Sequence, residues 1–144
     1  MISKIGLHEL ERFNELGLMI NKNFSNVYIL SDIIKSNFDE VYGFYQDDRL
    51  IGFIHILRMY ETLDIVNVVV DTEYRNRGVG SALLNYVIGL YEDVNSIMLE
   101  VNVNNTAAVS LYEKCGFEVI NRRNNYYGSD AALIMKRVVE NERC

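Results

Sequence analysis

The sequence lacks proline and tryptophan and has two cysteines, Cys115 and Cys144, in 144 residues. Two cysteines do not make a disulfide framework, which excludes the class of small domains held together by several bridges. No window approaches the ~18 consecutive apolar residues of a membrane span, and the first residues lack the basic-then-apolar layout of a signal peptide. We therefore expect a cytoplasmic protein that has no membrane partner.

Positive charge is scarce. The chain has 14 Lys and Arg against 20 Asp and Glu, which gives a formal net charge of −6. Such a charge repels nucleic-acid backbones, so we expect no direct nucleic-acid partner, and it favours cationic ligands. Hydrophobic residues make up 49% of the chain, enough for a full core, and the length suits a single domain over residues 1–144.

Hydrophobic periodicity changes several times along the chain, without a linker or an internal repeat. Spacings of three and four predict helices over 7–20, 30–38, 78–91 and 108–115. Runs rich in β-branched and aromatic residues predict strands over 41–45, 50–57, 64–70, 97–103, 117–120 and 131–135. The alternation indicates an α/β fold with an early antiparallel hairpin, a central β-α-β unit and a polar connection over 121–130. Gly116 follows the last helix where a left-handed cap belongs.

The most specific segment is the turn between strand 64–70 and the next helix. Gly78 and Gly80 have no Cβ, so the backbone there can approach a ligand closely, and the first amides of a helix point outward without an internal partner. Arg75 and Arg77 add positive charge. Two interpretations are possible: an anion site that binds a pyrophosphate, or a capped loop with two solvated arginines. The features together favour the anion site.

Two other nucleotide sites fit less well. Glu100 follows Gly80 by 20 residues, as in a dinucleotide-binding fold, but Leu83 occupies the third glycine position. Several residues also separate Val70 from Gly78, and only 144 − 103 = 41 residues remain for another nucleotide-binding half. A P-loop fails because no Gly-Lys-Ser/Thr follows the turn.

Other chemistry finds little support in the residues. His8 and His55 lack the spacing of metal ligands, so we expect no metal, and His55 fits a satisfied sheet position. Cys115 lies in an apolar stripe and is interpreted as a core residue. Taken alone, Glu100 would be an outward-facing strand residue, and Tyr112, in the same stripe as Cys115, a core residue.

The turn is similar to the signature of the GNAT superfamily of N-acetyltransferases, Arg/Gln-x-x-Gly-x-Gly/Ala, which is here Arg75-Asn76-Arg77-Gly78-Val79-Gly80. The resemblance implies a single domain with a mixed, mostly antiparallel central sheet flanked by helices. It also implies acetyl-CoA as co-substrate, with its pyrophosphate on backbone amides of the turn and its pantetheine arm along the preceding strand. The implied cofactor-binding residues are Val68, Val69, Val70, Arg75, Asn76, Arg77, Gly78, Val79, Gly80, Ser81 and Asn105.

Within this superfamily the second half of the chain resembles the ribosomal-protein-alanine N-acetyltransferases. Matching segments include Asn67-Val68-Val69-Val70, Leu99-Glu100-Val101, Leu111-Tyr112-Glu113, Arg122-Arg123 and Tyr126-Tyr127. The resemblance implies that Glu100 is the general base, directly or through one water, and that Tyr112 is the general acid. It implies that a backbone N–H, that of Val70, polarises the thioester oxygen. Asn105 would both cap a helix and bind pantetheine amides.

The implied acceptor is the N-terminal amine of a ribosomal protein whose leading segment is basic, which the net charge of −6 suits. Two departures border the expected acceptor site: 23–28 replaces a segment that in those relatives resembles Phe-Pro-Trp, and the connection after Tyr126 and Tyr127 is short. Both tyrosines are candidate walls of that site. A lysine side chain, a small amine, or a CoA-binding module without catalysis remain alternatives.

Overall fold

The fold is built on one seven-stranded sheet. The structure is a computed structural model that describes residues 1–127 and 130–138. The strands are β1 (Ile2–Lys4), β2 (Asp39–Gln46), β3 (Arg49–Met59), β4 (Thr62–Val70), β5 (Ser96–Asn102), β6 (Glu118–Tyr127) and β7 (Asp130–Val138). Their order is β1-β2-β3-β4-β5-β7-β6, and β4 with β5 is the parallel pair among antiparallel neighbours. The predicted mixed, mostly antiparallel α/β sheet is confirmed.

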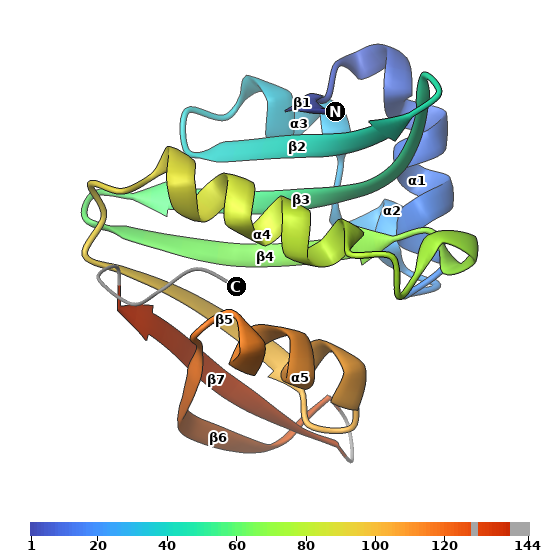
Figure 1. The fold of residues 1–144 in the computed structure, drawn as a ribbon. Coiled ribbons are helices and arrows are strands. Elements are labelled where there is room, and N and C mark those ends of the chain that lie inside the picture. The colour runs from blue at the N-terminus through green and yellow to red at the C-terminus, as the bar shows by residue number, and fades with distance from the viewer. Residues whose placement is uncertain (128–129, 139–144) are drawn as a thin grey trace.

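Helices cover both faces of this sheet (Figure 1). They are η1 (Leu7–Glu9), α1 (Leu10–Leu18), α2 (Phe24–Val27), α3 (Leu30–Lys35), η2 (Thr72–Tyr74), α4 (Val79–Leu90) and α5 (Thr106–Lys114). One buried cluster packs α4 and α5 on the sheet, and a second packs α1, α2 and α3 on it. The β4-α4-β5 crossover explains the parallel pair, because parallel strands need a long connection. Among the described helices, none is long and apolar enough to cross a membrane.

Two sequence-based expectations need correction. The single helix expected over 7–20 is divided into η1 and α1; Phe13 and Leu16 are buried, whereas Leu7 is 53% exposed. The stretch expected to be a polar connection, 121–130, is mostly strand, because β6 runs on to Tyr127. An edge strand is held by backbone hydrogen bonds to its one neighbour, here β7, so its side chains can be polar.

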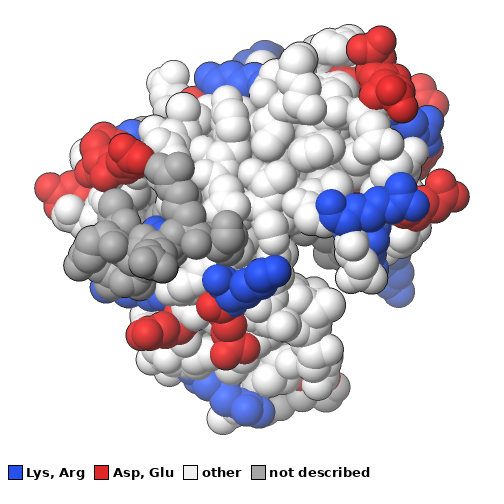
Figure 2. All heavy atoms as spheres, viewed as in Figure 1, with Lys and Arg blue, Asp and Glu red and all other residues white. Residues whose placement is uncertain are grey.

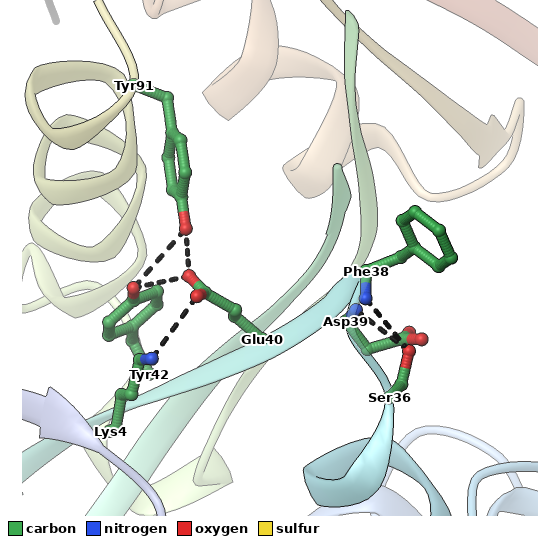
Figure 3. A network of polar contacts seen from close by, with 7 residues as sticks. All are labelled: Lys4, Ser36, Phe38, Asp39, Glu40, Tyr42 and Tyr91. Atoms are coloured by element: carbon green, nitrogen blue, oxygen red, sulfur yellow. Dashed lines mark hydrogen bonds and ion pairs between the residues drawn. The ribbon is translucent and has the colours of Figure 1, made fainter. Parts of the chain in front are cut away.

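A polar network attaches the end of α4 to the first two strands (Figure 3). The carboxylate of Glu40 accepts hydrogen bonds from the hydroxyls of Tyr42, at 2.5 Å, and Tyr91, and it pairs with Lys4 Nζ at 3.2 Å. Burial, and then the hydrogen bond and charge of Glu40, raise the pKa of Tyr42 well above its ordinary value. Tyr42 therefore stays a neutral donor, and the network fixes α4 over β2.

A buried ion pair attaches α1 to the junction between β4 and the glycine turn. Arg12 donates from Nη2 to Asp71 Oδ2 at 2.5 Å and from Nε to the Leu50 carbonyl at 2.8 Å. Asp71, 3% exposed, also accepts from the Glu73 N–H at 2.9 Å. Burial alone would raise the pKa of Asp71, but the bond from Glu73 and the Arg12 guanidinium outweigh it, so the pKa lies below its ordinary value.

We predict that Arg12→Gln lowers the free energy of unfolding at pH 7 by roughly 3 kcal/mol, because Asp71 is left buried without its cation. The lowered pKa of Asp71 makes this contribution present above the ordinary carboxyl value of about 3.9 and lost as the pH falls through the folded value. Urea denaturation at pH 7 and at pH 3.5 should therefore show the difference between variant and wild type shrinking in acid.

The matched control is Arg58→Gln, which removes the exposed ion pair of Arg58 with Asp93. Exposed pairs contribute little, so this variant should unfold nearly like the wild type. Equal effects of the two substitutions at pH 7 would contradict the assignment of Arg12 and Asp71 as the stabilising pair.

Candidate active site

The two central strands β4 and β5 separate partway along their length. Their pairing runs from Thr62 opposite Ser96 to Ile65 opposite Leu99 and ends there, although β4 continues to Val70 and β5 to Asn102. β5 stays paired with β7 throughout, so it is β5 together with β7 that diverges from β4. Along residues 67–70, backbone groups of β4 face the gap and can bind an extended ligand, as any open strand edge can.

A β-bulge lies where this divergence begins. In the β3–β4 register, His55 pairs with Asn67 and Ile56 with Ile65, which leaves Val66 as the extra residue on β4. A bulge bends its strand and increases its twist. The extra residue also shifts the alternation of side chains along β4. As a result, Val68 and Val70 lie on the same face as Ile65, the face that is packed by α4.

The glycine turn brings the start of α4 to this gap. Gly78 has φ +82°, and a Cβ added to it would meet nothing within 4 Å, so glycine serves the backbone conformation there. A Cβ on Gly80 would lie 3.1 Å from Leu111 Cδ2 and 4.0 Å from Val70 Cγ2. Gly80 therefore lets the first turn of α4 approach both α5 and the end of β4. The space-filling view shows a hollow between the surfaces over α4 and α5 (Figure 2).

The electrostatics of the turn favour an anion. Arg75, Arg77 and Gly78 are exposed, and the Arg77 guanidinium lies over the Tyr74 ring, 5.2 Å from its centroid. The first amides of α4 have no acceptor within the helix, and the helix dipole is positive at that end. Backbone donors, dipole and two arginines thus coincide at one place.

The other predicted cofactor residues differ in what they can contribute. Val69 is 0% exposed and packs toward α1, so only its backbone is available at the gap. Val68 and Val70 are partly exposed. Asn105 is the N-cap of α5, and its Oδ1 accepts from the Ala108 N–H at 3.2 Å, so the capping expected of this residue is observed.

Glu100 and Tyr112 lie on opposite faces of the sheet. Leu99, Val101 and Tyr112 belong to the core cluster under α4 and α5. Glu100, which alternates with the first two, points to the face that carries α1 and α2. Its carboxylate, 31% exposed, pairs with Arg123 at 3.2 Å. Tyr112 is 7% exposed and its ring is edge-on to Phe117 at 5.7 Å, so the core interpretation of this ring is correct.

The remaining candidates are placed as follows. His55 is buried and its Nε2 lies 2.6 Å from Asp39 Oδ1. Cys115 is 0% exposed. Within residues 1–127 and 130–138, no group of three or more His, Cys, Asp or Glu could hold a metal ion. The side chains of Tyr126 and Tyr127, and the connection 128–129, lie outside the described part of the chain.

Sequence reasoning missed three polar residues near the site. Arg12 and Asp71 are 59 positions apart in the sequence, so no local motif predicts that they pair. Asp64 lies on the same sheet face as Glu100, and it was visible only as an acidic residue at the start of an apolar strand. The strand register was needed to bring it to the site.

A family model described as acetyltransferase (GNAT) family matches residues 8–117. The chain therefore belongs to the GNAT family of acetyltransferases. It is 36% identical over 95 residues to the [ribosomal protein bS18]-alanine N-acetyltransferase of Salmonella typhimurium, a match covering 62% of this chain and 64% of that protein.

Solved structures agree in fold. The ribosomal-protein-S18-alanine N-acetyltransferase from Escherichia coli superposes with a TM-score of 0.83 at 24% identity, covering 99% of this chain and 95% of that one. A GNAT family acetyltransferase from Elizabethkingia anophelis with acetyl-CoA bound has a TM-score of 0.80 at 19% identity, covering 96% and 97%. The predicted family and fold are confirmed.

We predict that Gly78→Ala lowers the free energy of unfolding by about 1–2 kcal/mol, because alanine is strained at this positive φ. Gly78→Asn should cost less, since asparagine adopts the left-handed region more readily. Urea denaturation of both variants is the measurement. Because a Cβ here meets open space, equal losses for Ala and Asn would show that the backbone conformation is not the cause.

Proposed function

We propose that the chain transfers the acetyl group of acetyl-CoA to an amine in the cytoplasm, and that the acceptor is the N-terminal α-amine of a ribosomal protein. The observation that carries the proposal is the divergence of β4 from β5 beside the glycine turn. It offers an open strand edge and a helix N-terminus at one place, and a long donor with an anionic middle needs both.

The donor would extend from the turn into the gap. The pyrophosphate would accept hydrogen bonds from backbone amides between Asn76 and Ser81, with Arg75 and Arg77 beside it. The pantetheine arm would continue along β4 at 68–70, with a contribution from Asn105. The N–H of Val70 would polarise the thioester oxygen, because a donor aimed at developing negative charge lowers the barrier.

The transfer would be a direct attack within a ternary complex. Glu100 takes a proton from the acceptor ammonium, and the free amine attacks the thioester carbonyl. The acetyl–sulfur bond breaks as the acetyl–nitrogen bond forms, and the Tyr112 hydroxyl gives its proton to the leaving thiolate. No covalent enzyme intermediate is needed.

The acceptor assignment draws on the curated relatives and on charge. Those relatives are named for alanine of a ribosomal protein, but the match covers less than two thirds of their length. The net charge of −6 suits a basic peptide. In this chain the segment 23–28 contains α2, whose Phe24 packs between Phe13 and Tyr28. A lysine side chain or a small amine is the alternative acceptor.

The burial of Tyr112 favours a second candidate function. A phenol ring that is 7% exposed and packed on Phe117 serves the core whether or not chemistry occurs. The chain could then bind CoA as a sensing or partner-binding module without transfer. The two candidates differ in whether any acetylated product is formed.

We predict that incubation with acetyl-CoA and a panel of acceptors gives acetylation of the free α-amine of basic peptides, read by mass spectrometry. Matched peptides with a blocked N-terminus and a free lysine, and small amines such as spermidine, complete the panel. The preference for basic over acidic peptides should weaken with added salt, because screening removes the long-range attraction. Bound CoA without product on any acceptor would favour the binding module.

We predict that Glu100→Gln lowers kcat about 100-fold or more while the Kd for acetyl-CoA, measured by calorimetry, stays unchanged. Tyr112→Phe keeps the ring and its packing, so it should lower kcat while the fold is retained. Wild-type turnover in Glu100→Gln would remove this residue from the mechanism. Wild-type turnover in Tyr112→Phe would leave Tyr112 as a core residue only.

A further inference from the structure

A second carboxylate lies beside Glu100 on the same face of the sheet. Asp64 alternates along β4 with Leu63 and Ile65, which belong to the cluster under α4, so its side chain points to the opposite face with Glu100. The register sets Asp64 opposite Met98, two positions before Glu100 on β5. From the spacing of strands and of residues along them, the two Cα atoms are about 8 Å apart.

In the described part of the chain, no cation pairs with the carboxylate of Asp64. Leu57 on β3 and Met98 on β5 are its neighbours in register, and both are uncharged. Within the described ranges, no hydrogen bond or ion pair involving its carboxylate is present. Burial raises the pKa of Asp64, and the charge of Glu100 raises it further. The chain thus keeps two repelling carboxylates together, an arrangement that costs stability and is typical of functional sites.

Charges of both signs surround Glu100. Arg123 on β6 pairs with its carboxylate at 3.2 Å, and Asp64 on β4 acts from the other side. On β7, Lys136 is opposite Met98, and Asp130 accepts a hydrogen bond from Asn102 at 3.1 Å. A base placed between an arginine and a second carboxylate has its affinity for a proton set by the balance of the two charges.

We propose that Asp64 is a positioning residue whose charge, set against that of Arg123, fixes the pH range in which Glu100 accepts the proton of the acceptor ammonium. The inference depends on the proposed function. The proton leaves the ammonium nitrogen and forms an O–H bond on Glu100, while Asp64 keeps its negative charge. That charge stabilises the incoming cation before the transfer and makes Glu100 a stronger base during it.

The test compares pH profiles of kcat/KM for the wild type, Asp64→Asn, Arg123→Gln and the control Asp32→Asn, all with one acceptor peptide. Asp32 is an exposed carboxylate on α3, which packs on β2, so Asp32→Asn removes an equal charge far from β5. The acceptor amine titrates in the same way in the assays of all four proteins, so it does not contribute to differences between their pH profiles. We expect the acid limb to move by about 0.5 pH unit or more to lower pH in Asp64→Asn, and to higher pH in Arg123→Gln.

A second readout does not need activity. In protein labelled with ¹³C at the aspartate carboxyl carbons, the resonance absent from Asp64→Asn identifies Asp64. Its titration midpoint should lie above that of exposed aspartates and should fall in Glu100→Gln. The same midpoint with and without Glu100 would overturn the proposal even for an active enzyme.

The remaining outcomes separate the two proposals. An acid limb that moves no further in Asp64→Asn than in Asp32→Asn would overturn the role of Asp64 and leave the acetyltransferase proposal intact. A wild type that acetylates nothing would overturn the proposed function and this role with it, although the carboxyl titration would still report the coupling. If Asp64→Asn unfolds, Asp64→Ser provides the same removal of charge.

Discussion

The short pairing of β4 with β5 is the constraint on which the site depends. Four residues of each strand are paired, and beyond Ile65 and Leu99 the strands follow different neighbours. The bulge at Val66 bends β4 at that point, while β7 holds β5 along its whole length. Each strand therefore keeps one hydrogen-bonded neighbour where β4 and β5 diverge. The buried clusters on the two faces of the sheet stay intact.

The elements around this opening are held by contacts that lie away from it. Arg12 holds the junction of β4 with the glycine turn to α1, and Glu40 holds the end of α4 to β1 and β2. The end of β4 that leads into the glycine turn and the C-terminal end of α4 are thus fixed by polar groups whose partners are far away in sequence. A helix N-terminus can bind an anion with little reorganisation only if such contacts hold the helix in place, because preorganised donors lose less entropy on binding.

Local sequence patterns predicted the parts of this arrangement that local physics determines. Periodicity located β4, α4, β5 and α5 within a few residues, and Gly116 adopts the expected left-handed cap at φ +89°. Strand β1 and helix α2 are too short to give a period, and the polar residues 121–127 concealed the continuation of β6 beyond the predicted 117–120. The divergence was not predictable from residues 64–70, since an almost uniformly apolar run does not reveal a bulge. Arg12 with Asp71 and Asp64 with Glu100 required the tertiary register.

The opposite facing of Glu100 and Tyr112 limits how they could act together. In an intact sheet, a base on the α1 face and an acid on the α5 face would be separated by the backbone layer, and no single substrate could touch both. The gap beside β4 removes that layer locally. Under the proposed function, the donor would enter from the side of α4 and α5, and the acceptor from the side of α1 and α2. The thioester would lie in the plane of the sheet between them, so the reaction would need the strands to be apart at this one place.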